Sequence, residues 1–377
     1  MPGREKINTK RESSLCILLA PLDWGLGHTT RCLPIIKALL QRGVRVLVAG
    51  NSNQARLLKA EIPGLTVLPL EGYNLQYSRS GWMTRARIFL QIPKILTSIK
   101  REKTWVAALI HEQKIDAIIS DCRFGLSHPS VYCVFITHQL DIKIPLGRWV
   151  EKQLQKWNYH FIDRFNECWI PDYKHDHNLA GELSHPRELP ATKTIYIGAL
   201  SRLEAVQEEP AEEIDALILV SGPEPQRSIF ENLILKGLKK FNGSAIVLRG
   251  LPGEKKVREG FGSVTFSNHL TAEEISRLMQ RAKFVISRAG YSTIMDIVRL
   301  RKKSILIPTP GQTEQEYLGD YLMQKRLCLC FQQETFSLEK ALSEAAVYEY
   351  DDMNGFEQNC YQPAIDALIQ KLYSVNS

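Results

Sequence analysis

Residues 285–322 constrain the fold more than any other part of the chain. They read VISRAGYSTIMDIVRLRKKSILIPTPGQTEQEYLGDYL. Two apolar runs, at 284–287 and 304–307, predict buried strands, and each is followed by a turn and the start of a helix. A strand–turn–helix–strand–loop–helix unit brings its polar loop residues to the carboxyl ends of parallel strands, where such folds bind ligands. The stretch therefore predicts an α/β domain with a ligand site at that edge of the sheet.

The rest of the chain repeats this alternation of short apolar runs and helical patterns. With 377 residues, the chain is long enough for two domains. An acidic, polar stretch at 206–214 is typical of a linker. We therefore predict two Rossmann-like, doubly wound parallel-sheet domains facing a central cleft, at 15–205 and 215–360. A polar tail, 1–14, precedes them, and a last helix within 361–377 is expected to pack back on the first domain.

The individual elements follow from the same patterns. Fully apolar strands separated by helices are typical of parallel sheets that are covered on both faces. The helix expected at 272–280 follows Thr271. Thr271 is expected to cap it, with Glu274 as the reciprocal partner. The expected strands are 16–20, 44–49, 66–70, 117–120, 131–136, 167–170, 194–197, 216–220, 244–248 and 264–266, with helices at 31–42, 228–239, 272–280 and 361–372.

Composition excludes several classes of protein. No apolar run reaches the ~20 residues that a membrane-spanning helix needs. The amino-terminal residues MPGREKINTKRESS are charged and lack the apolar core of a signal peptide. The eight cysteines include no CxxC pair, and no histidine cluster accompanies them, which is atypical of zinc sites. We therefore expect a cytoplasmic protein with no metal and no cofactor.

Part of the net charge of +7 comes from one basic stretch of the chain. Residues 78–103 hold seven Lys or Arg and a single acid, Glu102, interleaved with large apolar side chains. One interpretation is a solvated helix face above core contacts. The other is a peripheral contact with anionic lipid headgroups at the inner face of the membrane. Basic and aromatic residues interleave in this patch alone and no nucleic-acid-binding motif is present, so we expect no nucleic-acid partner.

The second domain is predicted to hold a nucleotide sugar. A helix that opens behind Gly290 offers free N–H groups and a positive dipole end to phosphate. Asp296, about one turn further in, can accept hydrogen bonds from ribose hydroxyls. Residues 312–316 offer amides that suit a sugar, although acids at a helix start are also favoured by the helix dipole. The donor-site candidates in this stretch are Arg288, Gly290, Ser292, Thr293, Asp296, Gln312, Thr313, Glu314, Gln315 and Glu316.

Two further turns of the second domain are donor-site candidates. Ser221, Gly222 and Arg227 follow strand 216–220 and can contact phosphate, although the two prolines beside them also fit a purely structural turn. His269 follows strand 264–266 and is a candidate for lining the site.

The first domain has a glycine-rich turn, PLDWGLGHTTR, after strand 16–20. Gly25 and Gly27 permit positive φ and close approach by a ligand. His28 is the candidate general base, since an imidazole titrates near pH ~6.5, and its alternative role is a cap of the turn. Asp23 can orient His28 or cap the turn, and Asp23 or Asp121 are alternative bases.

Other residues of the first domain are expected to contact the acceptor. Asp121, after strand 117–120, and His138 and Gln139, after strand 131–136, take strand-end positions. Helix capping explains them equally well. The acceptor-side candidates are Gly25, Gly27, Thr29, His138 and Gln139.

These motifs resemble those of two-Rossmann-domain (GT-B) glycosyltransferases, and among them the MurG family. SRAGYSTIMDI followed by IPTPGQTEQEY is similar to that family's donor motif, and GLGHTT is similar to its glycine–histidine loop. The resemblance implies that Gly290 meets the diphosphate, Asp296 the ribose and Gln315 the sugar, with Glu316 in place of a glutamine. Leu26 replaces a glycine, and THQL, which includes Gln139, matches a family segment in part.

The resemblance covers most of residues 15–372 and implies an inverting, metal-independent transfer to an acceptor at the membrane surface. We therefore expect an enzyme that moves GlcNAc or a related hexose from a UDP-sugar to an acceptor hydroxyl. The sequence leaves the acceptor open among a lipid-linked saccharide, a polysaccharide and a small glycoside. Two alternatives remain open: an isomerase of the UDP-GlcNAc 2-epimerase type, and a protein that binds nucleotide sugars without catalysis.

Overall fold

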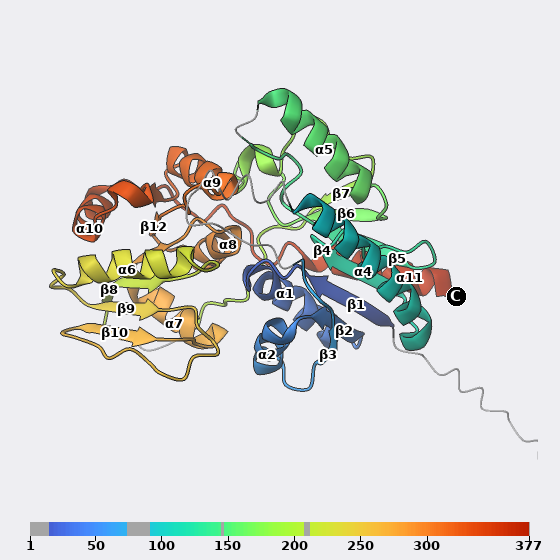
Figure 1. Ribbon diagram of the computed structural model, residues 1–377, viewed down its shortest axis with the longest axis horizontal. Helices are drawn as coiled ribbons and strands as arrows, with labels where there is room; N and C mark the ends of the chain where they lie inside the picture. Colours follow the sequence, from blue (N-terminus) through green and yellow to red (C-terminus); the bar gives the residue numbers. More distant parts are fainter. Residues whose placement is uncertain (1–14, 74–90, 145–146, 207–211, 377) are drawn as a thin grey trace, which may run out of the picture.

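The chain forms two parallel α/β domains in the computed structural model, which describes residues 15–73, 91–144, 147–206 and 212–376. Figure 1 shows the first domain, largely blue to green, beside the second, largely yellow to orange. Neighbouring strands in both sheets pair in parallel. The predicted fold class, two doubly wound parallel-sheet domains, is confirmed.

The first domain is built on a seven-stranded sheet in the order β3-β2-β1-β4-β5-β6-β7. Its strands are β1 (Cys16–Pro21), β2 (Arg45–Gly50), β3 (Thr66–Pro69), β4 (Ala117–Asp121), β5 (Tyr132–Ile136), β6 (Glu167–Ile170) and β7 (Lys193–Tyr196). Its described helices are α1 (Gly27–Gln41), α2 (Ser52–Glu61), α4 (Ile92–Gln113), α5 (Arg148–Ile162) and the short η1 (Gly181–Leu183).

The second domain is built on a six-stranded sheet in the order β10-β9-β8-β11-β12-β13. Its strands are β8 (Ile214–Leu219), β9 (Ala245–Leu248), β10 (Val264–Ser267), β11 (Ala282–Ser287), β12 (Ser304–Leu306) and β13 (Leu329–Cys330). The helices that follow β7 in the described chain are α6 (Gln226–Leu238), α7 (Ala272–Arg281), α8 (Tyr291–Arg299), α9 (Thr313–Gln324), η2 (Gln333–Thr335), α10 (Leu338–Val347) and α11 (Gln362–Asn376).

Local sequence explains most of these elements. Every residue of β1 and β4 is buried, as fully apolar runs in a covered parallel sheet require. The predicted capping box at the start of α7 is present, since Thr271 and Glu274 each satisfy a backbone N–H of the other. One boundary is wrong: the helix expected from residue 31 already begins at Gly27, which places His28 in its first turn.

The order of strands reverses at one point in each sheet, and ligand sites of such folds lie at these points. In the first sheet β1 and β4 are neighbours and Pro21 pairs with Asp121. In the second sheet β8 and β11 are neighbours and Leu219 pairs with Ser287. The loops that follow these four strand ends therefore belong to the two most favourable ligand positions of the molecule.

The last helix returns to the first domain. Figure 1 shows α11, in red, among the elements of the first domain. Arg42 Nε of that domain donates to Asp366 Oδ1 at 2.6 Å, and Lys371 Nζ donates to the hydroxyl of Tyr132 at 2.7 Å. Buried side chains of α1, α8 and α11 belong to one apolar cluster, so the two domains share part of their core.

Some expectations lie outside the described residues, namely the tail at 1–14, residues 78–90 of the basic stretch and residues 207–211 of the predicted linker. Residues 92–103 of that stretch belong to α4. None of the helices in the described part of the chain combines the length and the apolar character that crossing a bilayer requires.

Candidate active site

The amino-terminal ends of α1 and α8 meet at the junction of the two domains. A Cβ atom at Gly27 would lie 2.8 Å from Ser292 Oγ, so only glycine allows the two helices to approach this closely. Neither helix has a side-chain cap, and neither has an acid in its first turn. The free N–H groups and positive dipole ends of both helices therefore make this junction favourable for an anion.

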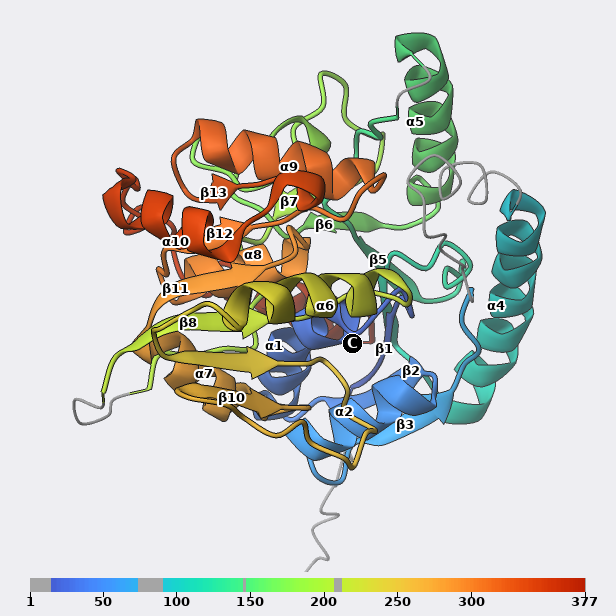
Figure 2. The same cartoon turned by 60° about the vertical axis from the view of Figure 1, so that its left-hand side comes forward.

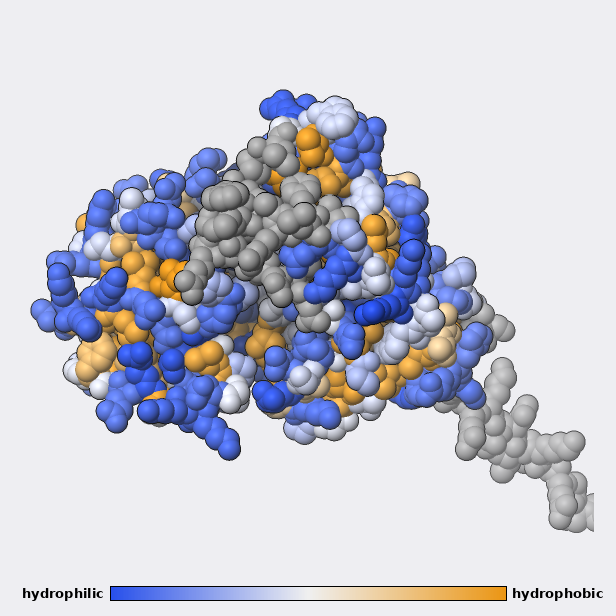
Figure 3. Space-filling view, viewed as in Figure 1, coloured by the Kyte–Doolittle hydropathy of each residue, from blue (hydrophilic) through white to orange (hydrophobic). Residues whose placement is uncertain are grey.

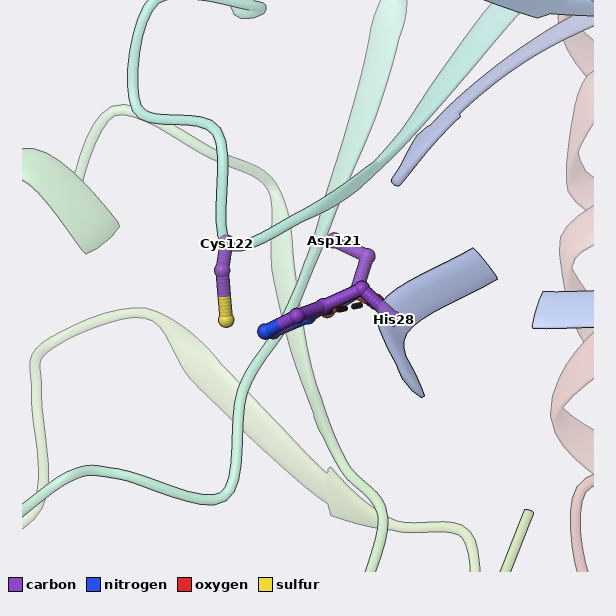
Figure 4. Close-up of side chains that lie close together, drawn as sticks. All are labelled: His28, Asp121 and Cys122. Atoms are coloured by element: carbon purple, nitrogen blue, oxygen red, sulfur yellow. Dashed lines mark hydrogen bonds and ion pairs between the residues drawn. The ribbon is translucent and has the colours of Figure 1, made fainter. Parts of the chain in front are cut away.

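His28 and Asp121 form a hydrogen-bonded pair at this junction (Figure 4). His28 Nδ1 lies 3.1 Å from Asp121 Oδ2, and the exposed fractions of the two side chains are 17% and 0%. An ionised carboxylate can only accept, so Nδ1 carries the proton and Nε2 is left as the basic nitrogen. The geometry gives His28 an oriented ring that remains partly accessible, as a general base needs.

Arg31, one turn after His28, holds the same carboxylate. Its Nε donates to Asp121 Oδ2 at 2.9 Å, and its terminal nitrogen donates to Oδ1. Burial alone would raise the pKa of Asp121, but Arg31 and His28 hold that pKa well below its ordinary range. Burial and the charge of Arg31 also lower the pKa of His28, which keeps the imidazole neutral at pH 7.

This arrangement corrects two sequence interpretations. Asp121 is fully buried and paired with Arg31, so it cannot itself take a proton from an acceptor; it orients His28 instead. Asp23, which was expected to orient His28, accepts from the backbone N–H of Tyr73 at 3.0 Å and lies 4.0 Å from Arg123. Asp23 therefore ties the loop after β1 to the segment after β3 and to Arg123, which is neither of its two predicted roles.

His28, Asp121 and Cys122 also offer three ligand atoms within 4.8 Å of one another (Figure 4). The Arg31 guanidinium already donates to both carboxylate oxygens, and its positive charge opposes a cation at the same place. Burial, with the charge of Asp121, raises the pKa of the Cys122 thiol to about 12, which disfavours a thiolate ligand. The chemistry of this group fits proton transfer better than metal binding.

His138 lies between the two domains. Its ring stacks on Tyr291 of α8 with ring centres 4.0 Å apart. Its Nδ1 lies 3.2 Å from Arg31 Nη1, and its Nε2 lies 2.8 Å from Glu314 Oε1 on α9. Gln139, the next residue, also donates to Glu314. Both residues therefore bridge the domains, where sequence reasoning expected acceptor contacts.

The other acceptor-side candidates divide into two kinds. Gly25 has a φ of +77°, a conformation that glycine adopts without strain, so the predicted turn is present. Thr29 is fully buried and its hydroxyl accepts from Gln54 Nε2 at 3.0 Å. Thr29 thus stabilises the start of α1, and its predicted contact with an acceptor is not supported by this placement.

In the donor half, α8 begins directly after Gly290 as predicted, and Ser292 and Thr293 lie in its first turn. Gly290 itself has an ordinary φ of −78°, which any residue can adopt. A Cβ at this position would meet nothing closer than Thr293 Oγ1, at 4.0 Å, among the described residues. The glycine therefore leaves open space in front of the helix, where a phosphate would approach.

Asp296 faces the segment that connects the domains. The hydroxyl of Ser201 donates to its Oδ1. Burial raises the pKa of Asp296 to about 6, against the opposing effects of Ser201 and Arg202. Ser201 occupies one of the two carboxylate oxygens, and the ribose contact of Asp296 stays a prediction.

The segment 312–316 differs most from its predicted role. Gln315 is buried and its Oε1 accepts from Thr309 N at 2.9 Å, while Glu316 Oε1 accepts from Gly311 N at 2.7 Å. Glu314 turns to the first domain, and although burial would raise its pKa, His138 lowers it. These three side chains brace the loop and the domain junction, whereas Gln312 and Thr313 stand partly exposed at the start of α9.

Two arginines predicted to meet phosphate are engaged inside the second domain. Arg227 donates to Glu224 at 2.7 Å and to Glu231 at 2.9 Å. Arg288 is buried against the ring of Phe230, and its terminal nitrogens donate to the carbonyls of Ile307, Pro308 and Gln226 and to the side chain of Gln333. Both guanidinium groups hold loops together, so their predicted phosphate contacts are not supported.

The remaining donor candidates lie on loops. Gly222, with a φ of +106°, and Ser221 follow β8 at the point where the strand order reverses, as predicted. His269 lies largely exposed between β10 and α7, and partial desolvation of its ring together with the charge of Arg202 lowers its pKa.

Sequence reasoning missed Arg31 and Tyr291. Arg31 lies one helical turn after His28, so its side chain was a neighbour of the predicted base. Tyr291 directly follows Gly290, and its hydroxyl donates to the Pro171 carbonyl of the other domain at 2.7 Å. Helical spacing was a signal for the first residue, but no local signal indicated the second.

Comparison with known proteins agrees with this architecture. Residues 239–354 match the glycosyltransferase family 28 C-terminal domain. The chain is 24% identical over 362 residues to the UDP-N-acetylglucosamine--N-acetylmuramyl-(pentapeptide) pyrophosphoryl-undecaprenol N-acetylglucosamine transferase of Clostridium botulinum, covering 90% of this chain and 92% of that protein. The transferase of the same name from Gloeothece citriformis is 22% identical over 317 residues, covering 82% and 80%. The crystal structure of Acinetobacter baumannii MurG superposes with a TM-score of 0.55 at 16% identity, covering 95% of this chain and 99% of that one.

Proposed function

We propose that this chain, a MurG-like glycosyltransferase of the GT-B fold, moves GlcNAc or a related hexose from a UDP-sugar to the hydroxyl group of a lipid-linked acceptor. The observation that carries the proposal is the His28–Asp121 pair at the amino-terminal end of α1, directly opposite the amino-terminal end of α8. The sugar and the lipid-linked acceptor are taken from the names of the two transferases to which the chain is similar.

His28 is the base of the proposed reaction. Its Nε2 removes the proton of the acceptor hydroxyl as that oxygen attacks the anomeric carbon of the donor sugar. The bond from this carbon to the diphosphate oxygen breaks, and UDP leaves with the electron pair. Asp121 holds the ring by Nδ1 and stabilises the imidazolium that forms. Attack opposite the leaving group inverts the anomeric centre.

The leaving diphosphate is stabilised at α8. Its first N–H groups have no side-chain cap and no acid beside them, so they are available to the charge that develops on the departing oxygen. We propose that these groups supply the stabilisation without a metal ion. Transfer is therefore expected to persist in excess EDTA, measured as UDP release.

A peripheral membrane contact belongs to the same proposal. The outer face of α4 has a hollow of about 450 Å³ lined by Thr97, Lys100, Arg101, Thr104 and Trp105. Figure 2 shows α5 above α4 along the same side of the molecule, and in Figure 3 hydrophobic surface lies among hydrophilic side chains at the top, where α5 is. Trp149 and Trp157 of α5 are exposed, beside Lys152 and Lys156. Such a basic surface with tryptophans suits anionic headgroups.

A panel of nucleotide sugars in a thermal-shift assay tests the donor class without an acceptor. We expect UDP-GlcNAc or a related UDP-hexose to raise the melting temperature, because ligand that binds only the folded state stabilises it. No stabilisation by any nucleotide sugar would overturn the proposal. Epimerised sugar nucleotide in an acceptor-free reaction would show an isomerase instead.

Turnover with a prenyl-diphosphate-linked saccharide tests the reaction. His28→Ala is expected to reduce UDP release by about 10²- to 10⁴-fold, because a general base contributes in this range. The stabilisation by donor should persist in this variant. Release within a few-fold of the unmodified enzyme would remove His28 from the mechanism.

A further inference from the structure

A chain of hydrogen bonds crosses the domain junction from α9 to the proposed base. It runs from Glu314 to His138 at 2.8 Å, from His138 to Arg31 at 3.2 Å, from Arg31 to Asp121 at 2.9 Å and from Asp121 to His28 at 3.1 Å. We call these five residues the inter-domain chain. Four of them belong to the first domain, and Glu314 is the member that comes from the second.

The donors and acceptors of this chain have one consistent assignment. Arg31 can only donate, so His138 Nδ1 must accept and its proton sits on Nε2. That proton points at Glu314 Oε1, and a carboxylate can only accept. Glu314 therefore selects the tautomer of His138, which in turn gives Arg31 Nη1 an acceptor.

The neighbouring residues restrict rotation of the His138 ring. Its side chain is 5% exposed, and its ring stacks on Tyr291, whose hydroxyl is bound to the first domain through Pro171. Without Glu314, Nε2–H would lose its partner, which costs free energy and favours rotation of the ring. Arg31 would then lose its hydrogen bond to His138 Nδ1 and would hold Asp121 less rigidly.

We propose that Glu314 is a positioning residue for the His28 base and that it acts through His138, Arg31 and Asp121. The pair that transfers the proton is fully ordered only while α9 is docked on the first domain, so the base is ready only when the donor and acceptor halves are together. The inference rests on the proposed function for the reaction itself, whereas the coupling between Glu314 and His28 does not depend on it.

Variants of Glu314 are suited to a test because α9 has other contacts with the first domain. Tyr317 accepts from the backbone N–H of Glu182 at 2.7 Å, and Tyr321 donates to Asn178 at 2.7 Å. These contacts hold the helix in place when Glu314 is changed. Asp320→Asn is the matched control, because it removes one negative charge from the exposed face of the same helix.

The first test is the ¹⁵N spectrum of the imidazole rings in histidine-labelled protein without ligand. His28→Gln and His138→Gln assign the two sets of signals. We expect the unmodified protein to show the proton on Nε2 of His138 and on Nδ1 of His28. Glu314→Ala should average the His138 tautomers and shift the His28 signals, Glu314→Gln should restore them in part through its amide oxygen, and Asp320→Asn should change neither. Unchanged His28 signals in Glu314→Ala would overturn the inference.

The second test is kinetic. Glu314→Ala is expected to reduce the rate of UDP release by about 10- to 100-fold, the cost of a slightly misplaced catalytic group, with donor affinity unchanged. In a His28→Ala background the same substitution should have no further effect, because both changes disable one unit. Additive losses, or a weaker donor affinity that accounts for the whole effect, would show that Glu314 contacts the donor and would overturn the inference. Coupled imidazole signals in a protein without transferase activity would uphold the inference while the proposed function fails.

Discussion

His28 and Asp121 lie 93 positions apart in the chain, and their contact is what turns an ordinary histidine into a candidate base. The partner of each titratable group decides its role. Asp121 is neutralised by Arg31 and orients His28, whereas the burial of Asp296 is offset by the Ser201 hydroxyl and the charge of Arg202. Two buried carboxylates of similar sequence appearance therefore have pKa values shifted in opposite directions.

The pH dependence of transfer follows from the pKa of His28. A base must be neutral, so kcat/KM should rise as pH passes upward through this pKa. Burial and Arg31 lower the pKa from its ordinary 6.5, so the acidic limb of the profile should have its midpoint below pH 6.5. Arg31→Met removes one of the causes that lower the pKa and should move the midpoint to higher pH. A midpoint above 6.5 in the unmodified enzyme would contradict this prediction.

Asp296 gives a prediction for stability. Its pKa is raised from 3.8 to about 6 on folding, so the folded state favours the protonated form and stability is lost as pH rises through 6. Asp296→Asn keeps an acceptor for Ser201 without the charge. It should increase the free energy of unfolding by about 2 kcal/mol above pH 6, and the gain should disappear below about pH 4. Denaturant unfolding at several pH values measures this.

Asp296→Asn should also bind UDP-sugar more weakly if the Asp296 carboxylate accepts hydrogen bonds from the ribose hydroxyls. A gain in stability without a loss of donor affinity would remove Asp296 from the donor site. Ser201→Ala is a useful comparison, because it leaves the carboxylate in place and removes its present partner.

At the scale of elements, the decisive feature is the meeting of α1 and α8. Each helix follows a strand next to the reversal point of its sheet, so each would be a ligand position in an isolated domain. Gly27 removes the side chain that would keep them apart, and the two positive helix ends then face one space.

A side chain at position 27 should separate the two helices. Gly27→Ala places a Cβ 2.8 Å from Ser292 Oγ and 3.3 Å from Ser292 Cβ, so the Ser292 side chain or the helices must shift. We expect a loss of turnover of about tenfold or more, since small displacements of catalytic groups are costly. The double variant with Ser292→Gly removes both clashing atoms and should recover most of the activity, with Ser292→Gly alone as the control. Failure of this rescue would show that the space is needed for another reason.

In the whole molecule, two elements from the carboxyl-terminal half of the chain contact the first domain. Helix α11 comes from the end of the chain and packs on the first domain, while α9 of the second domain contacts the loop around η1 of the first. The basic faces of α4 and α5 are both on the first domain, and burial and the charge of Arg164 on the loop after α5 lower the pKa of Lys103 on α4. In the proposed function, one domain would thus carry the membrane-facing surface and the base, and the other domain would carry the donor helix.

Binding to vesicles tests this division. The double variant Lys100→Glu with Arg101→Glu should bind vesicles of phosphatidylcholine and phosphatidylglycerol at least about tenfold more weakly, because each basic residue near an anionic surface contributes about 1 kcal/mol. Added salt should weaken the binding of the unmodified protein. Lys239→Glu with Lys240→Glu makes the same charge change on the second domain and should have little effect. Equal losses in both variants would indicate a net-charge effect and no defined surface.

The sequence by itself determined the strands, the parallel sheets and the helix start at Thr271, because apolar periodicity and capping bonds join residues that are close in the chain. It also indicated the candidate base, the helix proposed to bind the donor and the glycines in front of both helices. The tertiary structure alone decided the partners of the polar side chains. Glu314 and His138 are 176 positions apart, and Asp296 and Ser201 are 95 apart. A buried polar group must pair with whatever the packing of two domains brings beside it, and local sequence does not contain that information.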